Sequence, residues 1–174
     1  MDRCNKLVDV GRRQFLRGGA LAAAASATAV TLPAAPARAQ AALARVDYPS
    51  NHLGNIADLA VNEPFDVTYP DEEAPGVLLK LGTPVEGGVG PDGDIVGFST
   101  VCPHKGYPLN YSADDRTLNC PGHYSRFDCE AGGQQIWGQA TQNLPQYALS
   151  VDEKGDIYAE GVDELLYGRL SNVL

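Results

Sequence analysis

The chain has 174 residues, of which 44% are hydrophobic and 20% charged, a composition typical of a globular protein. Its formal net charge is −9, and residues 40–174 alone hold seven basic and twenty acidic residues, a formal charge of −13. This excess of acidic groups disfavours nucleic-acid binding, which requires basic residues that neutralise phosphates. It serves solubility, and it favours encounters with basic soluble proteins if acidic groups lie near the functional site.

Residues 1–39 have the features of an export signal. The arginine pair Arg12-Arg13 is followed by an uncharged, alanine-rich stretch at residues 18–32. Small residues at the spacing that signal peptidases recognise then predict cleavage after Ala39. Together these features resemble a twin-arginine signal, which exports proteins that have already folded around a cofactor. The alternative, an ordinary amphipathic helix, is disfavoured because the uncharged stretch has no polar face.

The leader predicts where the protein works. Export in the folded state places it in the periplasm and indicates a cofactor that is inserted before export. The uncharged stretch is fifteen residues long, which is shorter than the roughly 20 residues that span a bilayer. If the leader were retained, it would associate the protein with the membrane.

Residues 40–174 are expected to form one all-β domain after an extended lead-in at residues 40–55. Residues 82–93 are rich in Gly and Pro and predict a loop, and residues 163–170 predict one short terminal helix. The predicted strands either alternate apolar and polar residues or are continuously apolar, and the last two form a hairpin. They are residues 65–69, 77–81, 95–101, 147–151 and 156–160.

Four of the chain's cysteines and histidines form two tight pairs. Cys102 and His104 form a C-x-H pair, and Cys120 and His123 form a C-x-x-H pair, with fifteen residues between the pairs. Two short loops that each carry two such side chains are able to clamp a compact inorganic centre. The pairs therefore predict a metal centre.

Two kinds of metal centre use these side chains. In a zinc site all four ligands converge on one ion, which favours gaps of about two to four residues within each pair. The single residue between Cys102 and His104 fits better with two irons, of which one binds both cysteines and the other both histidines. We therefore expect one Rieske-type [2Fe–2S] cluster on Cys102, His104, Cys120 and His123, with zinc as the alternative. A catalytic Cys–His pair is disfavoured, because it does not explain the duplication.

Four neighbours of the ligands are expected to support the cluster. Gly106 and Gly122 permit tight turns that point backbone N–H groups at the cluster sulfurs. Ser125 is placed to donate its hydroxyl to a sulfide. Pro145 either closes a third loop over the cluster or simply precedes a strand.

Three further residues have no assigned role in the centre. Cys129 is expected in a strand, as a small buried hydrophobic residue. His52 is expected at the surface or at a partner contact, and Trp137 in the core.

The pattern C-x-H, fifteen residues, C-x-x-H resembles that of the Rieske family. The resemblance implies an antiparallel β sandwich or barrel with a small cluster-binding subdomain of two ligand loops. In the cytochrome bc-type members an extra cysteine in each loop forms a disulfide, whereas this chain has Tyr107 and Gly122 there. Phe127 replaces a cluster-facing tyrosine of those members. These departures place the chain outside that subgroup and imply a lower potential, because hydrogen bonds near the sulfurs stabilise the reduced cluster.

Longer segments, residues 65–71, 76–109 and 120–128, are similar to the small subunit of bacterial arsenite oxidase. In that family a large molybdopterin subunit with a 3Fe–4S cluster oxidises arsenite. The small Rieske subunit passes the electrons to a periplasmic cytochrome c or cupredoxin. The resemblance implies that this chain is the non-catalytic redox subunit of a hetero-oligomer. The alternatives are a stand-alone Rieske ferredoxin and the Rieske subunit of another periplasmic or bc-like oxidoreductase.

Overall fold

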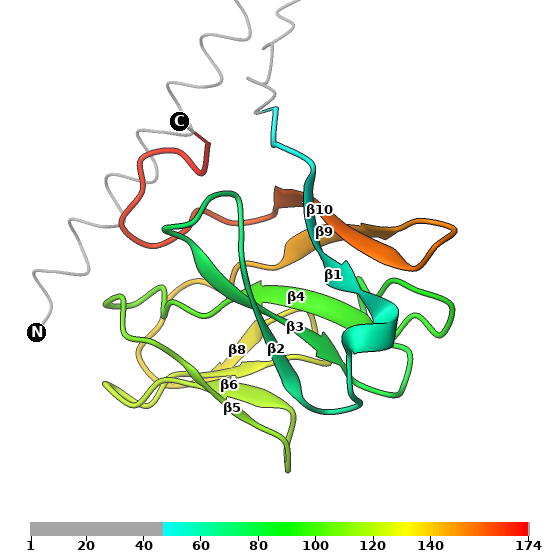
Figure 1. Ribbon diagram of the computed structural model, residues 1–174. Helices are drawn as coiled ribbons and strands as arrows, with labels where there is room; N and C mark the ends of the chain where they lie inside the picture. Colours follow the sequence, from blue (N-terminus) through cyan, green and yellow to red (C-terminus); the bar gives the residue numbers. More distant parts are fainter. Residues whose placement is uncertain (1–46, 174) are drawn as a thin grey trace, which may run out of the picture. The chain divides into compact units, whose positions relative to one another are not determined.

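The computed structural model describes residues 47–173 of the chain. This part holds ten short β-strands and one 3-10 helix, so the prediction of an all-β domain is confirmed. Figure 1 shows the strands arranged in small antiparallel sheets. No helix within these residues has the length and hydrophobicity needed to cross a membrane. The predicted leader, residues 1–39, lies outside the described residues.

The first sheet joins the two ends of the described chain. β1 (Asn51–Asn55) pairs with β10 (Asp156–Val162), and β10 pairs with β9 (Tyr147–Val151). The 3-10 helix η1 (Ile56–Asp58) follows β1, and the side chain of Asn55 caps it by accepting a hydrogen bond from the amide of Ala57. The hairpin between β9 and β10 turns at a glycine, as predicted, because Gly155 has a φ of +85° that other residues rarely adopt.

The second sheet forms the buried centre of the fold. It has the order β2 (Pro64–Thr68), β3 (Pro75–Lys80) and β4 (Ile95–Ser99). The middle of β3, residues 76–79, is apolar and buried on both faces of the sheet, whereas β2 alternates between exposed and half-buried residues. The predicted strands correspond to β2, β3, β4, β9 and β10 within two residues at each end, and residues 82–93 form the expected loop.

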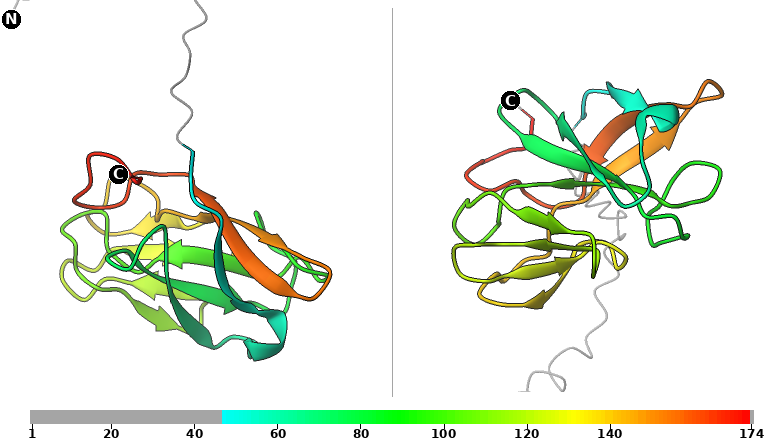
Figure 2. Two further views of the ribbon diagram at one scale, coloured as in Figure 1. Left: turned by 45° about the horizontal axis from the view of Figure 1, so that its top comes forward. Right: turned by 60° about the horizontal axis from the view of Figure 1, so that its bottom comes forward.

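The third sheet is inserted between β4 and β9. Its four strands follow one another in sequence order, and Figure 2 shows it (yellow-green) to one side of the other two sheets. The amide of Ser99, at the end of β4, donates a hydrogen bond of 3.0 Å to the carbonyl of Pro145, which ties the two ends of the insertion together. The strands are β5 (Asn110–Ser112), β6 (Thr117–Asn119), β7 (Arg126–Asp128) and β8 (Gln134–Trp137).

The predicted helix at residues 163–170 is wrong. This segment forms bends and turns, in which one short-range backbone bond, from the amide of Arg169 to the carbonyl of Leu166, stands beside bonds to residues outside the segment. The amide of Leu166 donates to the Oδ1 atom of Asn172, and the carbonyl of Leu165 accepts from the side-chain amide of Gln142. Gly168, with a φ of +80°, also lies outside the right-handed helical region.

Candidate metal centre

The first ligand loop connects β4 to β5 and closes on itself through backbone hydrogen bonds. The carbonyl of Cys102 accepts from the amide of Gly106 at 2.9 Å, and the amide of Cys102 donates to the carbonyl of Tyr107 at 2.8 Å. Gly106 has a φ of +70°, so the tight turn predicted for this glycine is confirmed.

The second ligand loop connects β6 to β7 and repeats the same scheme. The carbonyl of Cys120 accepts from the amide of Tyr124 at 3.1 Å, and the amide of Cys120 donates to the carbonyl of Ser125 at 2.8 Å. Tyr124 takes the position equivalent to Gly106 and also has a positive φ, +61°. The two loops are therefore built alike, although C-x-H and C-x-x-H differ in length.

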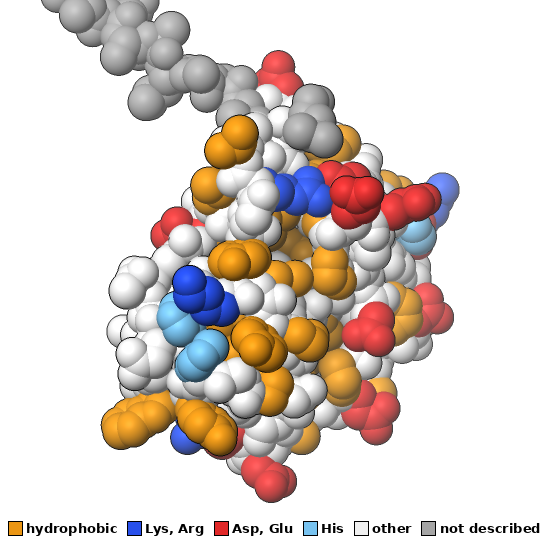
Figure 3. Space-filling model, turned by 90° about the vertical axis from the view of Figure 1, so that its left-hand side faces the viewer, with side chains coloured by type: hydrophobic (Ala, Val, Ile, Leu, Met, Phe, Trp, Pro, Cys, Tyr) orange, Lys and Arg blue, Asp and Glu red, His pale blue; other side chains and the backbone are white. Residues whose placement is uncertain are grey.

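The fold brings all four predicted ligands together. The thiols of Cys102 and Cys120 lie within hydrogen-bonding reach of each other, and the rings of His104 and His123 have centroids 4.8 Å apart. The cysteines are buried, at 0% and 3% exposure, whereas His123 is exposed. Figure 3 shows two adjacent histidines (pale blue) at the surface, with hydrophobic side chains (orange) around them. The centre thus has sulfur ligands inside and imidazoles outside.

The chemistry of the site fits an iron–sulfur cluster. The Nδ1 atom of His104 is buried and has no hydrogen-bond partner among the described residues, as expected of a nitrogen reserved for a metal. The backbone amides of His104 and Lys105 donate to the sulfur of Cys102, although burial, the larger effect, raises the pKa of its thiol. Burial thus favours the neutral thiol, and a metal that binds the sulfur displaces its proton. The side chains of this site therefore fit an iron–sulfur cluster.

The hydroxyl of Ser125 is held firmly beside the second loop. Its side chain is fully buried, and its oxygen accepts hydrogen bonds from the amides of Gln139 at 3.1 Å and Ala140 at 3.0 Å. Both contacts use the oxygen as acceptor, so its proton is left to donate elsewhere. Donation of this proton to a cluster sulfide stays a prediction.

Gly122 lies in a turn of the second ligand loop, as predicted, and it also has a packing role. Its φ is not positive, and what requires a glycine is the ring of Tyr107, which would lie 2.9 Å from an added Cβ. Tyr107 also packs edge-on against His123, with centroids 5.8 Å apart. The two positions that carry the disulfide in bc-type members are therefore in direct contact here, through a ring packed on a glycine.

Pro145 lies two residues before β9, as the strand interpretation expected. Its neighbour Leu144 belongs to the apolar cluster that contains both cysteine ligands and the fully buried Phe127. This segment therefore supports the cysteines from inside, and its closure over the cluster stays a prediction.

The three unassigned residues have different outcomes. Cys129 is fully buried, as predicted, although it lies just after β7, and burial raises its pKa to about 12. His52 is exposed, with its Nε2 atom 3.5 Å from the carboxylate of Asp156. The prediction that Trp137 lies in the core is wrong, because 67% of its surface is exposed at the end of β8. Hydrophobicity alone does not reveal an aromatic residue that is kept at a surface.

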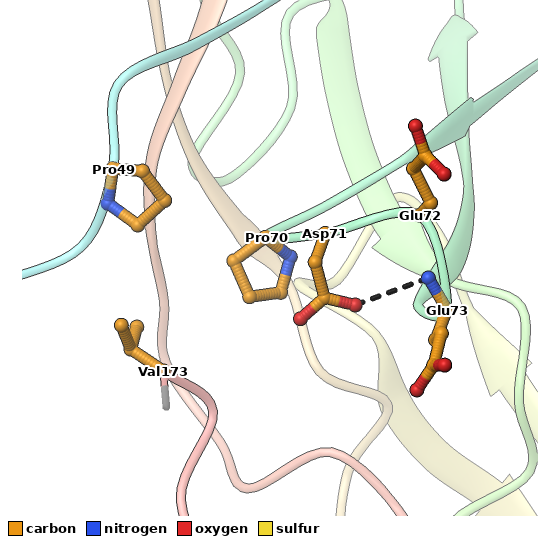
Figure 4. A pocket seen from close by; sticks show the side chains of 6 residues that line it. All are labelled: Pro49, Pro70, Asp71, Glu72, Glu73 and Val173. Carbon is orange, nitrogen blue, oxygen red and sulfur yellow. Dashed lines mark hydrogen bonds between the residues drawn. The ribbon is translucent and has the colours of Figure 1, made fainter.

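A separate hollow of about 510 Å³ lies away from the cysteines and histidines of the centre. Figure 4 shows its lining, in which the backbone amide of Glu73 donates to Asp71. Arg169 of the C-terminal segment binds the carboxylate of Asp71 with two hydrogen bonds, of 2.5 and 2.7 Å. This ion pair ties the C-terminal segment to Asp71, and none of the four cluster ligands lines the hollow.

Comparisons with known proteins agree with this geometry. The Rieske [2Fe-2S] domain model matches residues 52–148. The chain is 41% identical to the iodate reductase subunit IdrB of Denitromonas iodatirespirans, over 94% of this chain and 86% of that protein. The cytochrome bc1 complex Rieske subunit of Corynebacterium efficiens is 39% identical, over only 40% of this chain and 17% of that protein.

A solved structure shows the same fold. The soluble domain of Rieske protein II (soxF) from Sulfolobus acidocaldarius superposes with a TM-score of 0.63 at 25% identity, over 71% of this chain and 82% of that one. Together with the family match, this decides between the two metal centres in favour of iron and sulfide. The chain belongs to the Rieske [2Fe–2S] family, and one [2Fe–2S] cluster is its cofactor.

Proposed function

We propose that this chain is the electron-transfer subunit of a periplasmic oxidoreductase of the arsenite oxidase type, with its cluster held by Cys102, His104, Cys120 and His123. The observation that carries the proposal is their convergence, with buried thiols behind and imidazoles at the surface. A relative that matches nearly the whole chain is itself named as an oxidoreductase subunit.

The residues of the centre have different roles in electron transfer. The two cysteines would hold one iron of the cluster and the two histidines the other, and the cluster would supply one-electron transfer. The apolar cluster around the cysteines excludes water from their sulfurs. The exposed side of His123 gives a partner protein a short path to the centre. The chain thus relays electrons and leaves substrate chemistry to another subunit.

The partners proposed for this role follow from the arsenite oxidase resemblance. A large molybdopterin subunit with a 3Fe–4S cluster would oxidise arsenite, and each arsenite converted to arsenate releases two electrons. The present chain would pass them singly to a periplasmic cytochrome c or a cupredoxin. This chain would reach the periplasm already folded, through the twin-arginine route that residues 1–39 predict.

Iodate reduction is the second candidate, favoured by one specific observation. The 41% identity with an iodate reductase subunit extends over 94% of this chain. In a reductase the same centre would work in the opposite direction, because electrons would then enter the complex from the soluble carrier. The arrangement of ligands serves either direction of transfer.

A two-substrate assay of the purified complex tests the proposal. We expect the chain to co-purify with a larger molybdenum-containing subunit that oxidises arsenite with a c-type cytochrome as acceptor. The Cys102→Ser variant should assemble but lose acceptor reduction. Iodate-dependent oxidation of a reduced carrier, without arsenite oxidation, would establish the second candidate instead. Purification without any larger subunit would contradict both.

A further inference from the structure

A groove opens beside the second ligand loop, which carries the exposed ligand His123. It has a volume of about 440 Å³, and the ligand Cys120 forms part of its wall. Trp137 and Tyr124 also line it, with 67% and 72% of their surfaces exposed. An occupant of this groove would therefore contact the ligand loop itself.

The third sheet holds the groove open by its strand register. Asn119 of β6 lies opposite Arg126 of β7, which in turn lies opposite Trp137 of β8. The Nε atom of Arg126 donates to the Oδ1 atom of Asn119 at 3.0 Å, which fixes the guanidinium in this row. Gly138 lets the end of β8 approach the loop, because a Cβ there would come within 2.4 Å of the Cα of Ser125.

The chemical character of the groove is that of a protein docking site. Trp, Tyr and Arg are the residues most enriched at the energetic centres of protein interfaces, and all three meet here. Trp137 is the only tryptophan of the chain, yet the fold leaves it largely exposed. Exposed aromatic residues grouped around a cavity mark an interaction surface more strongly than scattered apolar residues do.

The charges of this sheet indicate the kind of partner. Residues 110–137 hold four acidic and two basic residues. Both arginines already have acidic partners, since Arg116 pairs with Glu130 and Arg126 with Asp115. The sheet therefore presents an excess of negative charge, which would attract a partner with a basic docking face and speed its encounter.

A second surface near the centre suits a different partner. The C-terminal segment exposes Leu165, Tyr167 and Leu170, and the ring of Tyr167 would lie 2.4 Å from a Cβ added to Gly106 in the first ligand loop. Exposed hydrophobic surface of this kind is typical of permanent subunit contacts. An electron-transfer subunit needs one surface for its permanent partner and one that a soluble carrier can reach and leave.

We propose that the groove formed by Cys120, Tyr124, Arg126 and Trp137 is the docking site of a soluble one-electron carrier protein with a basic face. The proposal rests on the electron-transfer role proposed above. In the oxidising direction, one electron passes from the reduced chain to one ferric haem iron of the docked carrier, which becomes ferrous.

Stopped-flow oxidation of the full, cluster-loaded chain tests the groove. The reduced protein is mixed with a basic c-type cytochrome and, in parallel, with ferricyanide, which needs no protein docking. We expect Trp137→Ala to lower the second-order rate with the cytochrome by about tenfold, as for the loss of an interface hot spot. Trp137→Phe should retain most of the rate. Leu170→Ala, which removes exposed apolar surface from the C-terminal segment, is the matched control and should not change it.

A second measurement requires no substitution. Because Trp137 is the only tryptophan, 5-fluorotryptophan labelling gives one ¹⁹F resonance, which should shift in a saturable way as the cytochrome is added. An unshifted resonance, or a Trp137→Ala rate within twofold of wild type with the cytochrome, would overturn the proposed groove. An equal loss of rate with ferricyanide would also overturn it, because the substitution would then act on the cluster.

Different results would contradict the proposed function. If the wild-type reduced chain reacted with ferricyanide but with no soluble carrier protein, basic or acidic, the role as a relay to soluble carriers would be wrong. If an acidic cupredoxin reacted as well as the basic cytochrome, and Trp137→Ala changed neither rate, only the docking site would be wrong.

Discussion

Cys102 and Cys120 differ from Cys129 in surroundings rather than in burial. All three are buried, but the thiols of the first two lie beside each other, and backbone amides donate to the sulfur of Cys102. The groups that affect the pKa of the Cys129 thiol include no second cysteine. The same residue type therefore acts as a ligand in one place and as core packing in another.

The Cys129→Ala variant should keep its cluster. With a pKa of about 12, the Cys129 thiol stays protonated and unreactive at neutral pH. We expect an unchanged visible spectrum and a loss of about 1 kcal/mol in the free energy of unfolding, from the lost packing of one atom. Cys120→Ser is the control and should lose the cluster absorption. Bleaching in both variants would show that Cys129 takes part in the centre.

The Ser125→Ala variant should lower both stability and cluster potential. The amides of Gln139 and Ala140 would lose their buried acceptor, at a cost of about 1–3 kcal/mol for each unsatisfied group. The hydroxyl proton would no longer stabilise the reduced state, which moves the potential downward. Urea unfolding and an EPR-monitored redox titration measure the two effects. A reduced stability with an unchanged potential would show that the hydroxyl does not reach a sulfide.

At the scale of elements, the two ligand loops are held together by packing instead of a disulfide. Each loop closes with the same pair of backbone hydrogen bonds, and the ring of Tyr107 from the first loop covers Gly122 in the second. The spacing of the ligands predicted the two loops. Their identical closure was not visible in the sequence, because a glycine holds the left-handed position in one and Tyr124 in the other.

The Gly122→Ala variant tests this packing directly. The added Cβ would lie 2.9 Å from the ring of Tyr107 and would push the two loops apart. We expect a cluster that bleaches several-fold faster in the presence of a chelator, with little change in far-UV circular dichroism. The double variant Gly122→Ala/Tyr107→Ala should recover part of the loss, because the smaller side chain removes the clash. No difference between single and double variants would rule out the contact as the cause.

Element length explains which parts of the fold the sequence predicted. Five of the six strands with five or more residues, such as β3 and β4, have apolar patterns and were predicted, whereas β1 lies in the segment expected to be an extended lead-in. β5 to β8 have only three or four residues each, too few to show a period of two. The C-terminal segment was predicted as a helix because its composition allows one, but hydrogen bonds to Asn172 and Gln142 determine its shape.

At the scale of the whole molecule, the C-terminal segment is held by an ion pair whose strength depends on pH. The hydrogen bonds from Arg169 hold the pKa of Asp71 below its usual range. The ion pair therefore contributes its full share to the free energy of unfolding above the pKa of the carboxyl in the unfolded chain, about 3.9. This stabilisation is lost as the pH falls through the lower pKa of the carboxyl in the folded protein.

The Asp71→Asn variant checks this dependence. We expect it to be less stable than wild type at pH 7, by at most about 1 kcal/mol because the carboxylate is partly exposed. The difference should shrink as the pH falls below about 4, where the wild-type carboxyl also becomes neutral. Urea midpoints at pH 7, 5 and 3 give the comparison. A difference that grows towards acid pH would contradict the assigned direction.

The central claim is that the four side chains joined by this fold hold a Rieske cluster. Low-temperature EPR of the reduced full chain, with histidine labelled by ¹⁵N, tests it most directly. The account predicts an average g value below that of the free electron and couplings to two histidine nitrogens, one of which is lost in His104→Cys. A reduced, iron- and sulfide-replete protein with an all-cysteine type spectrum and no histidine coupling would contradict it.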